Sequence, residues 1–170
     1  MDYLWSPWRY RYVSEGAKSE ECVFCRIGAD PAQDSKNFVL HRARFNFILL
    51  NLYPYTTAHT LIAPYDHIAM LSGLPEEALQ EMFVLSGDLE KVLQSAYHPE
   101  GFNMGMNLGK CAGAGIADHL HLHFLPRWTG DTNFMSVTSE TRVLPEDLPE
   151  TYAKLLPFFT QPAQSKPIGP

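Results

Sequence analysis

Basic residues are in short supply in this chain. Thirteen lysines and arginines stand against 19 acidic residues, which gives a net charge of −6 over 170 residues. Nucleic acids and anionic membrane surfaces are recognised through an excess of positive charge. The charge balance therefore argues against both nucleic acids and anionic membranes as partners. Any phosphate that the protein binds must be bound by a local arrangement of residues.

Long apolar runs are also missing. No stretch reaches the roughly 18 consecutive apolar residues that a membrane-spanning helix needs. The first residues, MDYLWSPWRYRYV, contain neither an uninterrupted apolar segment nor a small-residue cleavage site. Neither a transmembrane segment nor a secretory leader is indicated, and we expect a soluble, cytoplasmic protein.

Cysteine is scarce, with three residues in the whole chain. That number makes a poor disulfide framework. Cys22 and Cys25 form a Cys-x-x-Cys pair, which is typical of half a metal site or of a redox pair, whereas Cys111 stands alone in a glycine-rich stretch. Two ordinary free thiols are the alternative interpretation of the pair.

The composition that is present describes one globular domain. Hydrophobic residues make up 45% and charged residues 19% of the chain, and its length is sufficient for a single core. We assign the domain to residues 21–159. Residues 1–20 form an aromatic N-terminal arm, which we expect to pack against another surface. Residues 160–170 form a loose C-terminal tail.

Hydrophobic periodicity predicts an α+β fold. Five short apolar or alternating segments are expected to be strands of one antiparallel sheet: 38–42, 46–51, 59–63, 102–108 and 119–124. Apolar residues at helical spacing predict one long helix from Pro75 to Tyr97. A shorter C-terminal helix is expected over residues 146–159.

The most informative motif is HisLeuHisLeuHis at 119–123. A strand turns alternate side chains to the same face, which would place His119, His121 and His123 in a row about 6–7 Å apart. The row fits a three-histidine zinc site or a nucleophilic histidine with two helpers. Three unrelated surface histidines are a weaker alternative.

A glycine-rich loop precedes the histidines and favours one of these interpretations. Residues 107–115 read AsnLeuGlyLysCysAlaGlyAlaGly. Glycines let backbone N–H groups turn inward and form an anion-binding nest. Such a nest suits phosphate and does not suit a bare metal ion, so the pattern favours a nucleophilic histidine that acts on phosphorus.

These motifs resemble the histidine triad (HIT) superfamily. AspHisLeuHisLeuHisPheLeuProArgTrp at 118–128 is similar to its signature, and the resemblance continues through residues 50–64 and 101–109. It covers about residues 22–135. AsnLeuTyrProTyr, the AsnLeuGly turn and ProArgTrp followed by GlyAsp resemble the bacterial diadenosine tetraphosphate phosphorylase branch more than the phosphoramidase branch. The resemblance implies a HIT-like fold and a homodimer.

The resemblance also implies catalytic roles. His121 would attack the α-phosphorus of a nucleotide and become transiently nucleotidylated, and His123 would contact the phosphate oxygens. His119 is expected either on the substrate side or as a metal ligand, because one imidazole cannot easily ligate a metal and also protonate a leaving group. His59 is expected to be structural.

Further residues are assigned to the nucleotide by the same resemblance. Asn51 would contact the ribose hydroxyls, and Asn107 the transferring phosphoryl group together with loop amides freed by Gly113 and Gly115. Many family members carry Gln or a Ser-Thr pair just before the triad, where this sequence has GlyIleAla at 115–117. A polyphosphate leaving group therefore suits this site better than an amine. Lys110 and Arg127 are either additional phosphate contacts or solvated surface.

The Cys-x-x-Cys pair matches bacterial members in which two thiolates and two histidines hold a structural zinc ion. The matching residues are Cys22, Cys25, His67 and His119. A Cys₂His₂ set is a normal zinc site. With zinc bound, catalysis would narrow to His121 and His123, and no organic cofactor is expected.

The function implied by the resemblance is nucleotidyl transfer or hydrolysis. The expected substrate is a dinucleoside polyphosphate, diadenosine tetraphosphate in particular, with phosphate or water as acceptor. One alternative is a hydrolase of nucleoside phosphoramidates or mononucleotides that uses the same intermediate. Another is a nucleotide-binding or zinc-stabilised interaction module with little turnover.

Overall fold

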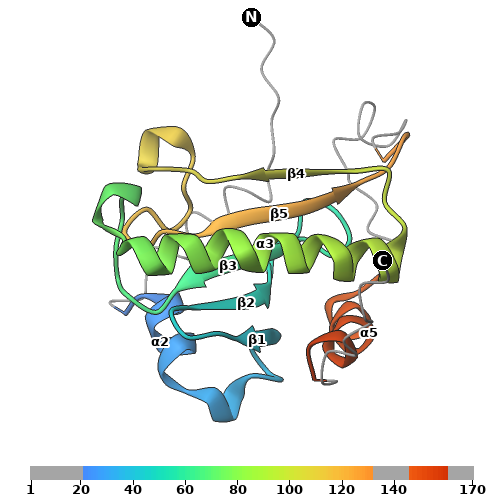
Figure 1. Cartoon of the computed structure of the whole chain (residues 1–170), viewed down its shortest axis with the longest axis horizontal. Helices are drawn as coiled ribbons and strands as arrows, with labels where there is room; N and C mark the ends of the chain where they lie inside the picture. The colour runs from blue at the N-terminus through green and yellow to red at the C-terminus, as the bar shows by residue number, and fades with distance from the viewer. Residues whose placement is uncertain (1–20, 132–145, 161–170) are drawn as a thin grey trace, which may run out of the picture.

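The computed structural model describes residues 21–131 and 146–160 (Figure 1). The aromatic arm over residues 1–20 and nearly all of the C-terminal tail lie outside the described residues. The division of the chain into arm, domain and tail therefore stays a prediction.

The described residues form a five-stranded antiparallel sheet with the order β1-β2-β3-β5-β4 (Figure 1). The strands are β1 (Val39–Arg42), β2 (Asn46–Leu50), β3 (Thr60–Pro64), β4 (Gly101–Gly105) and β5 (Leu122–Arg127). Every residue of β2 and β3 is buried, as the apolar runs in their sequences require. The predicted α+β class and five-stranded sheet are confirmed.

The histidine strand begins later than the sequence predicts. β5 starts at Leu122, so His119 and His121 precede it. Ile62 of β3 pairs with Leu122, and continuing this register would place Pro64 opposite Leu120. Proline has no N–H to donate to the ladder. The N–H of Leu120 donates instead to the carbonyl of Ile68, 2.6 Å away. β4 likewise ends at Gly105, before the predicted position 108.

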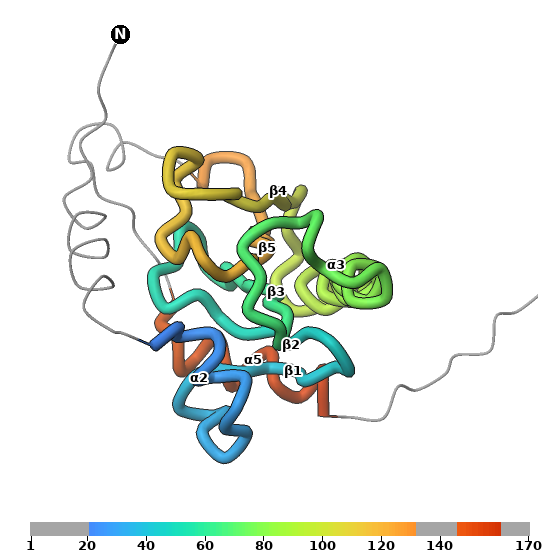
Figure 2. Tube along the Cα trace, turned by 90° about the vertical axis from the view of Figure 1, so that its left-hand side faces the viewer, coloured from blue at the N-terminus to red at the C-terminus, as the bar shows by residue number. Residues whose placement is uncertain are grey.

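Two helices cover one face of the sheet (Figures 1 and 2). The long helix α3 (Glu76–Tyr97) begins one residue after Pro75, whose extended conformation makes it the N-cap. The helix ends at His98, which adopts the left-handed conformation with a φ of 47°. The C-terminal helix α5 (Leu148–Thr160) packs beside it and buries Leu155 completely.

A third helix, α2 (Val23–Ala29), covers the opposite face of the sheet (Figure 2). Phe24 and Ile27, one helical turn apart, pack there against Phe47, Leu49 and other buried residues of the strands. This helix was not predicted from the sequence, because its seven residues are too few to show a helical period.

Strand alternation divides the core into two clusters. Leu120, Leu122 and Phe124 face the α3 side of the sheet, where they join the larger cluster. His121 packs instead against Phe24 of α2, with ring centroids 4.9 Å apart. The α2 side of the sheet therefore carries the histidines.

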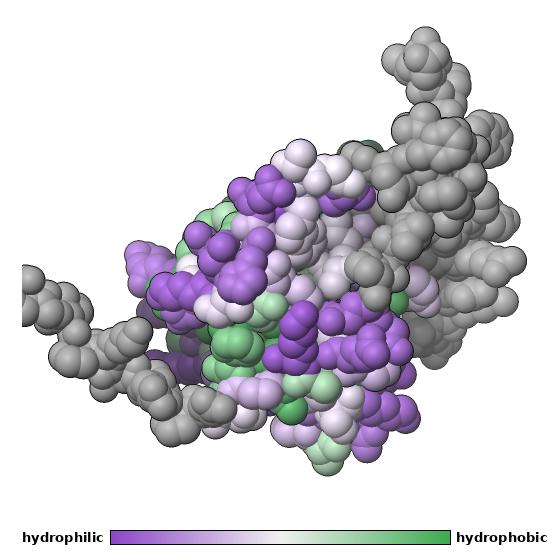
Figure 3. Space-filling model, turned by 90° about the vertical axis from the view of Figure 1, so that its right-hand side faces the viewer, coloured by the Kyte–Doolittle hydropathy of each residue, from purple (hydrophilic) through white to green (hydrophobic). Residues whose placement is uncertain are grey.

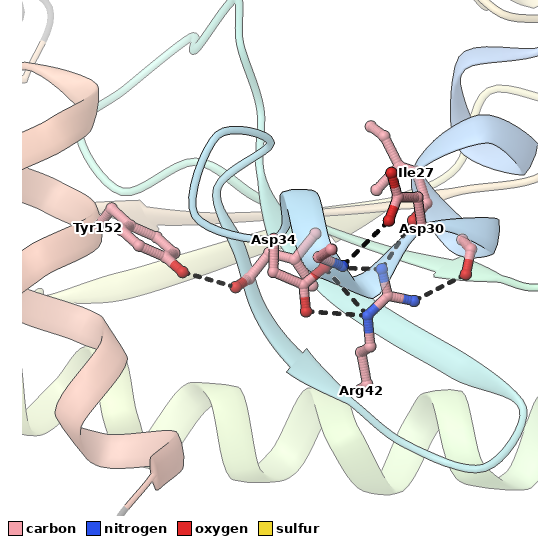
Figure 4. Close-up of polar contacts among 8 residues, drawn as sticks. Ile27, Asp30, Asp34, Arg42 and Tyr152 are labelled. Atoms are coloured by element: carbon pink, nitrogen blue, oxygen red, sulfur yellow. Dashed lines mark hydrogen bonds and ion pairs between the residues drawn. The ribbon is translucent and has the colours of Figure 1, made fainter.

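Arg42 of β1 connects this strand to α2 through hydrogen bonds (Figure 4). Its guanidinium donates to the carbonyls of Ile27 at 2.7 Å and Gly28 at 2.8 Å, near the end of α2, and it pairs with Asp34 at 2.7 Å. A cation at a helix C-terminus satisfies carbonyls that lack helical partners and is favoured by the helix dipole. On the neighbouring side, the Tyr152 hydroxyl donates to the carbonyl of Val39.

The outer surface carries scattered apolar side chains. The face drawn in Figure 3 is a mosaic in which hydrophobic residues occupy a limited area among hydrophilic ones. Phe83 and Val84 of α3 are about half or more exposed, at 51% and 64%. None of the helices in the described part of the chain is long and apolar enough to span a membrane.

Candidate active site and metal cluster

The three histidines of the motif share the α2 face of the sheet, as the alternating pattern predicts. Phe24 of α2 lies against His119 and His121, with ring centroids 5.1 and 4.9 Å apart. The rings of His121 and His123 are 4.9 Å apart and steeply inclined, at 66°. The buried leucines between the histidines hold the row in place from the opposite face.

His121 has one ring nitrogen committed to the backbone. Its Nδ1 lies 2.9 Å from the carbonyl oxygen of His119. A carbonyl can only accept, so Nδ1 carries the proton and Nε2 keeps its lone pair. Burial lowers the pKa of His121, and the bond to the carbonyl only partly opposes this. The side chain is thus a neutral imidazole with Nε2 as the free base.

His123 has the opposite arrangement of ring nitrogens. Its Nδ1 lies 3.0 Å from Nε2 of His59. Its own Nε2 is buried and has no hydrogen-bond partner among the residues that the structure describes. Burial, and to a smaller extent the electrostatic interaction with His121, lowers the pKa of His123 to about 4. A neutral ring therefore directs one unsatisfied nitrogen into the site.

His59 is more closely tied to the site than its predicted structural role suggests. The ring is 1% exposed, and its Nδ1 accepts the backbone N–H of Tyr55 at 3.1 Å. Leu61 pairs with His123 across the strands, so the residue two positions before Leu61 lies diagonally from His123 on the same face. The sequence shows that His59 and Leu61 are two residues apart and so share a face of their strand. It does not show that this face lies beside His123, because that depends on the strand register.

Four metal-binding side chains converge beside the row. The donor atoms of Cys22, Cys25, His67 and His119 all lie within 4.8 Å of one another. Cys22 caps the start of α2 and Cys25 lies one turn later, which puts both thiols on one side of the helix. His67 comes from the loop after β3. The four residues that the resemblance brought together are therefore neighbours in space.

The spacing of these donors fits a tetrahedral metal site. Nδ1 of His119 lies 3.3 Å from Cys22 Sγ, 3.5 Å from Cys25 Sγ and 3.3 Å from Nδ1 of His67. Nδ1 of His67 lies 3.2 Å from Cys25 Sγ. Zinc bonds of about 2.0–2.3 Å give a tetrahedron whose edges are roughly 3.3–3.8 Å. The cluster is thus close to the size of a zinc coordination shell.

His119 is turned toward this cluster and away from the phosphate side. Its Nε2 lies 3.0 Å from the carbonyl oxygen of Pro64 and must donate to it, which leaves Nδ1 with a lone pair facing the thiols. The orientation of this ring favours the metal-ligand role of His119 over the substrate contact, and both roles stay predictions. Burial, with a contribution from Cys22, raises the pKa of Cys25 to about 11, so a cation is needed to favour its thiolate.

The residues expected to bind the nucleotide are Asn51, Asn107, Gly113 and Gly115. Asn51 accepts the N–H of Tyr53 through Oδ1, at 2.9 Å, and its Nδ2 lies 3.3 Å from Nδ1 of His59. Asn107 is half-buried in the loop after β4. Gly113 adopts a φ of 92° and donates its N–H to the carbonyl of Lys110, so this amide serves the loop itself. Gly115 is exposed.

The two basic residues near the loop are not alike. Arg127 donates to Asp131 at 2.8 Å and to Asn103 at 2.6 Å, which uses its guanidinium to join β5 to its neighbours. A phosphate contact by Arg127 is therefore not supported. Lys110 is exposed at the start of the short 3₁₀ helix η3 (Lys110–Ala112).

Comparison with known proteins agrees with this geometry. The HIT domain family matches residues 32–130, which is more than half of the chain. A histidine row on one face of a five-stranded sheet, next to a glycine-rich loop, is thus accompanied by a direct family match, and the chain belongs to the histidine triad family.

Individual relatives cover most of the chain. It is 33% identical to a Mycobacterium tuberculosis protein named AP-4-A phosphorylase, over 89% of this chain and 80% of the relative. It is 31% identical to the adenosine 5′-monophosphoramidase of Candida albicans, over 65% of this chain and 73% of that protein. A zinc-bound histidine triad family protein from Mycobacterium smegmatis superposes with a TM-score of 0.66 and 28% identity, covering 82% of this chain and 93% of that one.

Proposed function

We propose that this protein transfers the nucleotidyl group of a dinucleoside polyphosphate, diadenosine tetraphosphate in particular, through a nucleotidyl-histidine intermediate on His121. The observation that carries the proposal is the bond from Nδ1 of His121 to the carbonyl of His119, 2.9 Å long. It directs the lone pair of Nε2 away from the backbone. A buried, neutral and oriented imidazole is what nucleophilic attack on phosphorus requires.

The reaction follows from this assignment in two steps. Nε2 of His121 forms a bond to the α-phosphorus, the bond from that phosphorus to the bridging oxygen breaks, and ATP leaves with the electron pair. In the second step an oxygen of phosphate, or of water that loses a proton to solvent, forms a bond to the same phosphorus. The phosphorus–nitrogen bond breaks, and Nε2 recovers its lone pair. Phosphate yields ADP and water yields AMP.

Other residues would stabilise the charge that develops on the phosphoryl oxygens. We assign the buried Nε2 of His123 to a phosphoryl oxygen, along with Asn107 and amides of the loop around Gly115. Asn51 is assigned to the ribose. Each of these groups acts by hydrogen bonding, so each would contribute to the rate without replacing the nucleophile.

The leaving group supports a polyphosphate over an amine. GlyIleAla at 115–117 offers neither a side-chain hydroxyl nor an amide to assist departure. ATP is a stable anion and can leave without receiving a proton, whereas an amine cannot. The name of the M. tuberculosis relative points to the same substrate class. Hydrolysis of nucleoside phosphoramidates is the second candidate, and the 31% identity to the C. albicans monophosphoramidase favours it.

We also propose that Cys22, Cys25, His67 and His119 hold a structural zinc ion. Zinc would supply a cross-link between α2, the loop after β3 and the histidine row, and no catalytic step requires it. The donor spacing supports the assignment, as does the structural similarity to the zinc-bound family member from M. smegmatis. A homodimer and a cytoplasmic location remain expectations drawn from the family resemblance.

The test is product analysis with diadenosine tetraphosphate in the presence and absence of labelled phosphate. We expect ATP in both reactions, with AMP as the second product in water and labelled ADP when phosphate resolves the intermediate. Two molecules of ADP without added phosphate would mean attack at an inner phosphorus and would contradict the assignment. Turnover of adenosine 5′-phosphoramidate alone would favour the second candidate. Binding without turnover of either substrate would indicate an interaction module.

A further inference from the structure

We propose that His59 is a positioning residue that holds His123 in the tautomer protonated at Nε2, so that this N–H donates to a phosphate oxygen of the substrate. The inference rests on the proposed function for the identity of the acceptor. The tautomers themselves follow from hydrogen bonds within the protein.

The relay begins at the backbone of Tyr55. Its N–H donates to Nδ1 of His59 over 3.1 Å. A backbone N–H can only donate, so Nδ1 of His59 must carry a lone pair and the ring proton of neutral His59 lies on Nε2. The loop between β2 and β3 thus fixes the tautomer of a histidine that is 1% exposed.

The second step passes this constraint to His123. The proton on Nε2 of His59 points to Nδ1 of His123, 3.0 Å away. Nδ1 of His123 therefore accepts, and the proton of neutral His123 lies on Nε2. The ring of Tyr55 also stacks on the ring of His123, with centroids 6.1 Å apart and an angle of 23°. These contacts leave the ring little freedom to rotate.

The far end of the relay is an unsatisfied donor. Nε2 of His123 is buried, and no described residue accepts its hydrogen bond. A buried donor without a partner costs about 1–3 kcal/mol, so its retention needs an explanation. An anionic oxygen placed beside His121 would accept from it and remove that cost. The chain thus prepares an N–H for the phosphoryl group before the nucleotide arrives.

Ring nitrogen NMR of the protein, labelled with ¹⁵N in its histidines, tests the relay without any substrate. We expect the protonated nitrogen to be Nδ1 in His121 and Nε2 in both His59 and His123. A proton on Nδ1 of His123 in the parent protein would overturn the proposal. This measurement does not depend on catalysis, so the relay and the proposed function can fail separately.

Two substitutions of His59 then test what the relay does. His59→Met removes the donor and should release His123, which is seen as a shift of its ring nitrogens toward a mixture of tautomers. With diadenosine tetraphosphate, kcat should fall about 10- to 100-fold, somewhat less than the 10²–10³ that removal of a stabilising donor costs, and KM should change little. His59→Gln keeps an amide N–H near the position of Nε2 and should restore both the nitrogen shifts and most of kcat.

A matched control separates this effect from simple loss of a histidine. His41 lies on β1 and stacks on Phe159 of α5, outside the histidine row. His41→Gln should leave the His123 shifts and kcat unchanged. Thermal unfolding shows whether each variant is folded. If folded His59→Met has parental His123 shifts and parental kcat, or if His59→Gln is as impaired as His59→Met, His59 is only structural and the proposal is wrong.

Discussion

His121 and His123 stand next to each other in the row, with rings 4.9 Å apart, yet they are fixed in opposite tautomers. Nδ1 of His121 donates to the carbonyl of His119, whereas Nδ1 of His123 accepts from His59. One ring therefore presents a lone pair at Nε2 and the other presents an N–H. A lone pair beside a donor is complementary to a phosphoryl group, whose phosphorus is attacked while its oxygens gain charge.

The first prediction concerns the lone pair. His121→Asn removes the only group proposed to form a bond to phosphorus, so turnover of diadenosine tetraphosphate should be abolished. Affinity for AMP, measured by calorimetry, should remain close to that of the parent because the ribose and loop contacts lie elsewhere. Acid-labile labelled nucleotide should appear on a peptide containing His121 in the parent protein and be absent from the variant.

The neighbouring donor should behave differently when it is replaced. His123→Asn removes one stabilising contact and should reduce kcat by about 10²–10³ while leaving measurable turnover. The order of the two variants is the decisive comparison. Residual activity in His121→Asn equal to or above that in His123→Asn would show that His121 is not the nucleophile.

The sheet was predictable because its strands have clear patterns. β2 and β3 are short, wholly buried runs, and the alternation of histidine with leucine in residues 119–123 requires one polar and one buried face. The grouping of Cys22 and Cys25 with His67 and His119 came from the family resemblance, because no local pattern links residues 97 positions apart.

Features that depend on tertiary contacts were not predictable from the sequence. The pairing of β3 with β5 ends at Ile62 and Leu122, and Pro64, which has no N–H to donate, lies two residues further along β3. The helix α2 is too short to show a period and depends on packing against β2 and on Arg42. The role of His59 requires the register that brings it diagonal to His123. Each of these features needs knowledge of which strands are neighbours.

A second prediction tests the glycine-rich loop. Gly115 is exposed just before the histidine row, and the sequence assigns it to a close approach between backbone amides and phosphate. Gly115→Val should weaken AMP binding severalfold without lowering the melting temperature. Gly87, on the exposed surface of α3 with open space around it, provides the comparison. Equal AMP affinity in Gly115→Val and the parent would remove the phosphate nest from the site.

A third prediction concerns a carboxylate that fixes the turn between β1 and β2. Glu81 of α3 accepts hydrogen bonds from the backbone N–H groups of Arg44, Phe45 and Asn46, and from the side chain of Asn46. Burial by itself would raise the pKa of Glu81. The bonds from Asn46 and the three amides outweigh burial and lower that pKa from its ordinary value of 4.5.

The sign of the resulting pH dependence follows from linkage. Because the pKa of Glu81 is lower in the folded state, its stabilisation is present above the unfolded pKa of 4.5 and is lost as pH falls through the folded pKa. Glu81→Gln should lower the free energy of unfolding by about 1–3 kcal/mol at neutral pH. Denaturation across a pH series should show this difference shrinking in acid. Glu90→Gln, at an exposed position of the same helix, should have little effect, and a pH-independent loss in Glu81→Gln would contradict the charge argument.

The fourth prediction concerns the metal cluster. Elemental analysis should find one equivalent of zinc per chain, held by the four convergent donors. Cys25→Ser should lose this zinc and lower the free energy of unfolding by more than about 2 kcal/mol. Cys111 is exposed and lies outside the cluster. Cys111→Ser is therefore the matched control and should keep both zinc and stability.

The loss of zinc should also affect the orientation of His121, because His119 belongs to both the metal cluster and the histidine row. Its ring faces the thiols, and its backbone carbonyl accepts the proton of Nδ1 of His121. Without metal, His119 loses the constraint on its position, and the lone pair of His121 is directed less well. We expect Cys25→Ser to retain part of its turnover, with kcat reduced and AMP affinity nearly unchanged, whereas His121→Asn has no turnover. A metal-free, folded variant with parental kcat would show that the zinc site only stabilises the fold, and complete loss of turnover in a folded variant would instead place the metal in the chemical step.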